Sequence, residues 1–351
     1  MEVPRYHDVA AGAGHVTPLE HASQPCNGQV PGRFQVLALD GGGLKGIFSA
    51  AVLAGLEEDI GRPILGYFDL VTGTSTGGII ALALGAGLRP REIVEFYVTQ
   101  RHEIFANRFG HRALRQLVAA KYNPSNLQAA LRGVFGETLL GDSRVPLVIP
   151  TYNLGDDDVY LFKTPHVERL KRDWRVPMWQ VAMATSAAPT FLPAFCLPSD
   201  KVRLIDGGIW ANNPAMVGVT EAVSLFKMPL DRIRVLSLGT TSAVAVRKRR
   251  LDRGGLVQWA RGASVVDVLL RGQSTGAHTQ VAHLLGADRV LRLDPPAPAG
   301  LSRLDAVDAD ELIGKASHHS RKACPQFEAT FADHLAAPYH PHHVHTTKTT
   351  R

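Results

Sequence analysis

The segment at residues 71–78, VTGTSTGG, constrains the fold more than any other part of the sequence. It contains a G-x-S-x-G pentapeptide with apolar residues on both sides, which predicts a strand, a sharp turn and a helix. Gly73 and Gly77 suit such a turn, because glycine lets the strand and the helix pack closely. A serine there is exposed to a base, and backbone N–H groups can face a developing oxyanion. Ser75 is therefore the candidate nucleophile, with a structural serine in a glycine-rich turn as the alternative.

A second glycine-rich loop precedes this segment. Residues 34–39 form an apolar run of strand length, and residues 40–46, DGGGLKG, connect it to a helical pattern. The consecutive Gly41, Gly42 and Gly43 leave their N–H groups unobstructed beside a helix N-terminus, where a negative charge is stabilised. A phosphate cradle is one interpretation, but neither common phosphate-loop spacing fits. An oxyanion hole is the other, if the two strands are neighbours in a parallel sheet and end at one edge.

A third segment places a carboxylate at the end of a strand. The apolar run at residues 202–205 is followed by Asp206, Gly207 and Gly208 and then by a helical pattern. A carboxylate in this position can act as a base towards Ser75. The alternative is a turn aspartate that caps the next helix.

The rest of the chain alternates between strand and helix patterns and predicts one α/β domain with a mostly parallel sheet. The expected boundaries are a flexible lead at residues 1–32, the domain at 33–336 and a disordered His- and Thr-rich tail at 337–351. The patterns predict strands at 145–150, 159–162, 233–238 and 289–293, and helices at 90–105, 123–136, 256–285, 308–322 and 326–335.

Composition narrows the class of protein. Lys and Arg number 38 against 32 Asp and Glu, so the net charge of +6 favours anionic surfaces. No segment mixes basic and aromatic residues in the manner of nucleic-acid binding, so no nucleic-acid polymer is expected as partner. Three widely spaced cysteines indicate a reducing compartment, and no apolar run reaches a membrane span. We expect a cytoplasmic protein without a secretory signal, with neither cofactor nor metal site.

Four motifs in this order resemble the patatin-like phospholipase family: DGGGLKG at 40–46, GTSTG at 73–77, ATSAAP at 184–189 and DGG at 206–208. The resemblance covers residues 34–295. It implies an α/β fold of three layers, with a mostly parallel central sheet and helices on both faces.

The resemblance also implies lipid acyl hydrolysis by a Ser-Asp dyad without a histidine. Ser75 would be the nucleophile, Asp206 its base, and the oxyanion hole would be formed by Gly41, Gly42 and Gly43. The other motif residues would support them, namely Asp40, Lys45, Gly46, Gly73, Gly77, Gly207 and Gly208. Lys45 is either a charge near the oxyanion or an exposed lysine at a helix start.

Two rival functions remain open. The order Ser75, Asp206 and then His278 or His283 permits a Ser-His-Asp triad on an α/β-hydrolase fold. A binding protein that uses the glycine loop as an anion site, with a vestigial serine, is the other rival.

The chain also resembles bacterial patatin-like effectors of CBASS anti-phage signalling in its overall length, in the segment at 122–142, in FKT at 162–164 and in DGGIWANNP at 206–214. Cyclic dinucleotides activate such effectors, which degrade membrane phospholipids. The resemblance implies a cyclic dinucleotide activator and peripheral action at the inner membrane. A constitutive lipase, lysophospholipase or esterase of the same family is the alternative. The basic run RKRR at residues 247–250 is a candidate ligand contact, although the sequence does not locate a regulatory pocket. The oligomeric state is open, with a homodimer considered.

Overall fold

The computed structural model describes residues 32–104, 120–199, 201–243, 255, 264–297 and 308–344. The chain divides after Gly32, and the unit that begins at Arg33 is described here by itself. The predicted lead thus falls outside the described residues, apart from Gly32. The basic run at residues 247–250 and the end of the predicted tail, at 345–351, also lie outside them.

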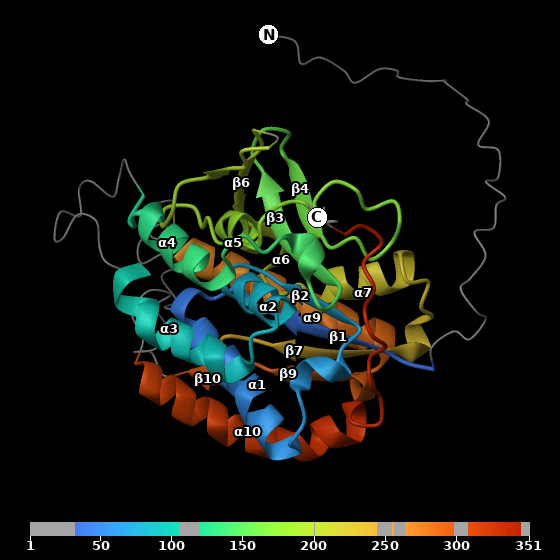
Figure 1. Cartoon of the computed structure of the whole chain (residues 1–351). Helices are drawn as coiled ribbons and strands as arrows, with labels where there is room; N and C mark the ends of the chain where they lie inside the picture. Colours follow the sequence, from blue (N-terminus) through green and yellow to red (C-terminus); the bar gives the residue numbers. More distant parts are fainter. Residues whose placement is uncertain are drawn as a thin grey trace, which may run out of the picture. The chain divides into compact units, whose positions relative to one another are not determined.

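Strands and helices alternate through most of the domain, as the sequence predicted (Figure 1). The strands are β1 (Phe34–Leu39), β2 (Leu70–Gly73), β3 (Leu147–Asn153), β4 (Asp158–Lys163), β5 (Phe195–Cys196), β6 (Arg203–Asp206), β7 (Ile233–Leu238), β8 (Ser242–Ala243), β9 (Val290–Leu293) and β10 (Pro296–Ala297). The α-helices are α1 (Gly46–Ile60), α2 (Thr76–Ala86), α3 (Pro90–Ile104), α4 (Pro124–Phe135), α5 (Met178–Thr185), α6 (Gly208–Ala211), α7 (Ala215–Ser224), α9 (Ser264–Leu285) and α10 (Ala309–Phe331).

The central sheet is mostly parallel. Its order is β5-β6-β3-β2-β1-β7-β9, and β4 also pairs with β3. Strands β3, β2, β1, β7 and β9 run parallel to one another. Strands β4 and β6 are antiparallel to β3, and β5 is antiparallel to β6. Because β1 and β2 are direct parallel neighbours, the loops that follow them start at the same edge of the sheet.

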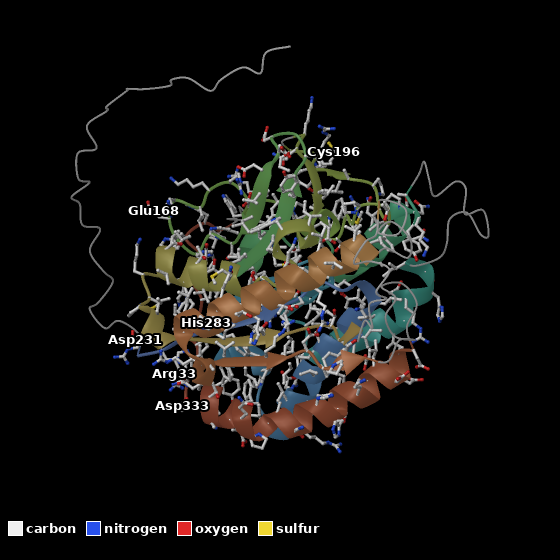
Figure 2. All side chains as sticks on the ribbon, turned by 180° about the vertical axis from the view of Figure 1, so that it is seen from behind. Arg33, Glu168, Cys196, Asp231, His283 and Asp333 are labelled. Atoms are coloured by element: carbon white, nitrogen blue, oxygen red, sulfur yellow. The ribbon has the colours of Figure 1, made fainter. Side chains whose placement is uncertain are left out.

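Helices cover both faces of the sheet, which confirms the expected three layers. Along β1, Leu37 and Leu39 join a core with α1, α2 and α10, whereas Val36 and Ala38 join a second core with α7 and α9. This alternation is the period of two that a strand buried on both faces requires. Figure 1 shows α1, α2, α3 and α10 on the near face, and Figure 2, from behind, shows α9 crossing the other face.

The C-terminal helical region differs from the prediction. We expected two helices separated near Pro325, but α10 is continuous and contains this proline. Proline removes one backbone hydrogen bond and normally kinks or breaks a helix. Here the apolar face continues past it, because Phe327 and Phe331 are buried against Tyr67 and Phe68. Tertiary packing therefore outweighs the local preference.

The two longest described helices are too polar to cross a bilayer. Helix α9 has 22 residues and α10 has 23. In the part of the chain that the structure describes, no helix is both long and apolar enough for a membrane span.

The described part of the predicted tail contacts the domain. The chain after α10 donates hydrogen bonds from Ala336 N to Gly66 O and from His342 N to Pro165 O. Residues up to 344 therefore run along the surface of the domain, from the end of α10 towards the loop that follows β4.

The packing of α10 generates a stability prediction. Phe327 is 0% exposed, and its ring contacts the rings of Tyr67 and Phe331. Phe327→Ala should reduce the free energy of unfolding by about 3–5 kcal/mol, because it leaves a cavity between α10 and the rest of the core. Leu335→Ala is the matched control, since Leu335 is 60% exposed. Equal urea midpoints for the two variants would contradict the packing described here.

Candidate active site

Ser75 lies at a strained elbow between β2 and α2. Its backbone has φ 55° and ψ −122°, a conformation that costs free energy in a residue with a Cβ. The Ser75 N–H donates to Thr185 Oγ1 at 3.0 Å, and this hydroxyl donates to Pro150 O at 2.7 Å. Helix α5 and strand β3 therefore hold the elbow in place.

Two glycines permit the close packing around this elbow. A Cβ on Gly73 would lie 2.1 Å from Gly77 O, and a Cβ on Gly77 would lie 2.2 Å from Leu39 O. Both contacts are with backbone, which has little freedom to move. The turn thus requires glycine at both positions, as the G-x-S-x-G pattern suggested.

The glycine loop after β1 lies beside Ser75. A Cβ built on Gly41 would be 3.3 Å from Ser75 Cβ. The Gly41 N–H is already used, because it donates to Asn212 O at 3.0 Å. Among the described residues, the N–H groups of Gly42 and Gly43 have no acceptor. Of the three amides predicted for the oxyanion hole, those of Gly42 and Gly43 are thus still available as donors, and Gly43 has the left-handed φ of 58°.

A buried ion pair anchors the glycine loop to the sheet. Arg292 on β9 donates to both carboxylate oxygens of Asp40, at 2.7 and 2.6 Å. It also donates to Ser237 Oγ at 2.7 Å and to Asp294 Oδ2 at 3.0 Å. Burial lowers the pKa of the Arg292 guanidinium, but the Asp40 carboxylate raises it more, so the arginine stays charged. Asp40 belongs to the predicted loop motif, whereas no sequence pattern indicated Arg292.

Lys45 faces the interior, so it is not an exposed lysine at a helix start. Its residue is 8% exposed, and its ammonium donates to Thr241 O at 3.0 Å. Gly46 follows at the start of α1, where a Cβ would lie 2.2 Å from Thr76 Oγ1. This contact places the start of α1 directly against the first turn of α2, next to Ser75.

Asp206 is the buried partner of Ser75. It ends β6, pairs with Thr151 on β3 and is 5% exposed. Its carboxylate accepts the Gly208 N–H at 2.7 Å, and the Ser75 hydroxyl lies beside it. Burial raises the pKa of the Asp206 carboxyl to about 6, although the Ser75 hydroxyl and the Gly208 N–H both oppose that rise.

The segment after Asp206 is packed tightly against β3. A Cβ on Gly207 would lie 2.3 Å from Pro150 O, and a Cβ on Gly208 would lie 3.0 Å from Asp206 Oδ1. These close contacts fix the position of the Asp206 carboxylate beside the Ser75 elbow.

The two histidines of the rival triad have other surroundings. His283 is exposed at the end of α9 (Figure 2). His278 is half-buried, and burial together with the Arg292 charge lowers its pKa. Among the described residues, no histidine is hydrogen bonded to Ser75 or Asp206. The structure thus brings the serine and the aspartate together without an imidazole between them.

Helix α9 links the glycine loop to the segment after Asp206. Ser274 Oγ accepts a hydrogen bond from Asn212 Nδ2 at 2.9 Å, and the Ser274 hydroxyl acts to lower the pKa of the buried Asp40 carboxyl. Asn213 Nδ2 donates to Ser274 O at 3.3 Å. No sequence pattern indicated Ser274, because its role depends on how α9 packs across the sheet.

An apolar cavity of about 200 Å³ lies next to the dyad. Its lining includes Met183, Ala187, Leu192 and Phe195. Ala187 connects it to the site, because Ala187 O accepts the Asp206 N–H at 3.1 Å. Ala187 thus contacts both the cavity and Asp206, so an apolar surface lies close to the carboxylate.

Comparisons with known proteins agree with this arrangement. A family model described as patatin-like phospholipase matches residues 37–219. A "cGAMP-activated phospholipase" of Pseudomonas aeruginosa is 32% identical over 322 residues, which cover 88% of this chain and 95% of that protein. A protein of the same description from Vibrio cholerae is 31% identical over 340 residues, covering 87% and 95%. "Patatin-like protein 1" of Oryza sativa subsp. indica is 33% identical over 283 residues, covering 69% and 68%. The expected resemblance is confirmed, and the chain belongs to the patatin-like phospholipase family of lipid-ester hydrolases.

Proposed function

We propose that this protein hydrolyses acyl esters of membrane phospholipids with Ser75 as nucleophile and Asp206 as base. The observation that carries the proposal is the placement of the Ser75 hydroxyl beside the buried Asp206 carboxylate, close enough to lower the pKa of that carboxyl. Two amides without acceptors, from Gly42 and Gly43, lie in the loop beside this serine. Nucleophile, base and oxyanion donors are the three groups that acyl transfer requires.

The reaction would proceed in two halves. Ser75 Oγ attacks the ester carbonyl carbon while its proton passes to Asp206, and the Gly42 and Gly43 N–H groups stabilise the oxyanion. The intermediate then collapses, the lysolipid alcohol leaves with the proton from Asp206, and the acyl group stays on Ser75. In the second half Asp206 takes a proton from water, the resulting hydroxide attacks the acyl-enzyme, and Ser75 regains its proton as the fatty acid leaves.

Burial makes Asp206 a stronger base than an ordinary aspartate. Its carboxyl pKa of about 6 lies nearer to neutral pH than the usual value of 3.8. Proton transfer is most effective when the pKa of the base lies close to the working pH. The buried site also favours the neutral, protonated carboxyl that forms during attack.

The dyad can be tested by matched substitutions. Ser75→Ala should reduce phospholipid hydrolysis to background and abolish labelling by a fluorophosphonate probe. Asp206→Asn should lower kcat by about 10²–10⁴-fold, since it removes the base but keeps the size of the side chain. His278→Ala is the control and should keep activity within a few-fold. A loss at His278 as deep as that of Ser75→Ala would indicate a triad instead.

The pKa of Asp206 sets the pH dependence. The base acts in its ionised form, so kcat/KM should rise with pH through about 6 and level off above it. Below that value the rate should fall tenfold per pH unit, because the active fraction falls in proportion. Initial rates with a soluble short-chain ester would measure the acidic side of the pH profile without a contribution from binding to vesicles. A rate that stays constant down to pH 5 would contradict a base with a pKa of about 6.

We further infer that a cyclic dinucleotide activates the protein and that it acts peripherally on the inner membrane from the cytoplasm. The support is the pair of bacterial relatives described as cGAMP-activated, which align over 95% of their own length. The net charge of +6 favours approach to an anionic leaflet. A constitutive lipase of the same family is the second candidate, because a relative whose description names no activator, "Patatin-like protein 1" of Oryza sativa subsp. indica, also aligns with 69% of the chain.

Activation can be tested directly. Fatty acid release from phosphatidylglycerol vesicles should be low without nucleotide and should rise at least tenfold with cyclic GMP–AMP. The same measurement on Ser75→Ala controls for contaminating lipases. Full activity of the wild type without nucleotide would favour the constitutive lipase.

A further inference from the structure

We propose that a basic groove beside β4 binds the phosphodiester groups of the activating cyclic dinucleotide. This inference rests on the nucleotide activation proposed above. The β4 groove has a volume of about 710 Å³, within the range of about 300–1,000 Å³ that is common for small-molecule sites. Its lining combines Lys163, Arg169, Lys171 and Arg172 with apolar side chains that include Val159 and Leu225.

The charge of the groove suits a ligand with two phosphodiesters. Arg169 and Lys171 are exposed, and no carboxylate among the described residues pairs with either. Asp173 is the acidic residue of the lining, and its carboxylate is neutralised by Arg172 and accepts hydrogen bonds from Tyr160 and from Lys163 N. Guanidinium and ammonium groups are the usual protein partners of phosphate.

The groove is held in shape before any ligand binds. Arg172 is fixed by Asp173, by Leu161 O at 2.8 Å and by the Tyr160 ring, whose centroid is 4.0 Å from the guanidinium carbon. From the opposite side, the segment at 332–344 holds the loop after β4, since His343 Nε2 donates to Glu168 O at 2.8 Å. Figure 2 shows Glu168 on the same side of the molecule as α7. A preformed site loses less conformational entropy on binding.

A buried carboxylate connects the floor of the groove to α7. Lys163 Nζ donates to Glu221 Oε2 at 2.6 Å, and Glu221 Oε1 pairs with His166 Nε2 at 2.9 Å. Glu221 is 3% exposed, and burial raises its pKa, but the His166 and Lys163 hydrogen bonds lower it more. The carboxylate is therefore ionised. A phosphate in the groove would compete with Glu221 for the Lys163 ammonium.

Helix α7 connects Glu221 to the segment that contacts the glycine loop after β1. Glu221 lies near its C-terminal end, and its N-terminal end follows Asn212, which accepts the Gly41 N–H. Between them, Gly218 packs against Val36, because a Cβ there would lie 2.6 Å from Val36 Cγ1. One rigid helix of ten residues, about 15 Å long, thus joins the groove to the oxyanion loop.

The test compares two double charge reversals in the full chain. Arg169→Glu with Lys171→Glu changes the groove, and Arg62→Glu with Lys322→Glu changes exposed residues elsewhere by the same charge. Isothermal titration calorimetry with cyclic GMP–AMP should show Kd raised at least tenfold in the groove variant and unchanged in the control. All proteins should hydrolyse a short-chain ester equally without nucleotide, because these residues lie outside the catalytic dyad.

The outcomes separate the two proposals. If the wild type binds the nucleotide and the groove variant binds it equally well, the groove assignment is overturned while nucleotide activation stands. If the wild type binds no cyclic dinucleotide, both fail. If the groove variant keeps its nucleotide affinity but loses binding to phosphatidylglycerol vesicles, the groove holds a lipid headgroup and the assignment is overturned.

The link through α7 has its own variant. Glu221→Gln keeps the shape of the side chain but removes the charge that holds Lys163. Nucleotide affinity should stay the same or increase, whereas the nucleotide-stimulated rate should fall towards the basal rate. Stimulation equal to that of the wild type would overturn the role of Glu221.

Discussion

The contact between the Ser75 hydroxyl and the buried Asp206 carboxylate is the interaction on which the rest of the site depends. Each partner is held by structure that has no chemical role of its own. Thr185 binds the backbone of the serine, and the pairing of β6 with Thr151 sets the position of the aspartate. The packing that buries the Asp206 carboxylate fixes its position and also raises its pKa. A small shift of β6 would change both the distance to Ser75 and the exposure to water.

The glycine loop after β1 is stabilised by charge rather than by apolar packing. Asp40 and Asp294 share Arg292, and Ser274 and Asn212 close the network from α9 and from the segment after Asp206. Removing the charged partner of a buried carboxylate strongly destabilises the folded protein. The network therefore fixes one conformation for a loop that contains three consecutive glycines and would otherwise have many. Preorganised donors of this kind stabilise the transition state without a reorganisation cost.

Local patterns predicted much of this arrangement. Hydrophobic period and parallel pairing predict the strands at 34–39 and 233–238, the helix near 123–136 and the adjacency of the two glycine-containing loops. Contacts between distant segments could not be predicted. Arg292 lies 252 residues from Asp40. Strand β6 reaches Ser75 while running antiparallel to β3, so the rule that parallel strands end together does not explain why Asp206 is there. The α10 helix crosses Pro325 because of packing that no local pattern contains.

The burial of Asp206 also has a consequence for evolution and engineering. A carboxyl that is easier to protonate when folded than when unfolded stabilises the fold in acid, and this contribution is lost as the pH rises through about 6. At neutral pH the chain therefore carries an ionised group that its own interior disfavours. Selection for thermal robustness alone would replace that group by a neutral one and, in the mechanism proposed above, would remove the catalytic base. Consensus or stability-guided redesign of this fold should leave that position unchanged, since tolerance of heat and turnover compete there directly.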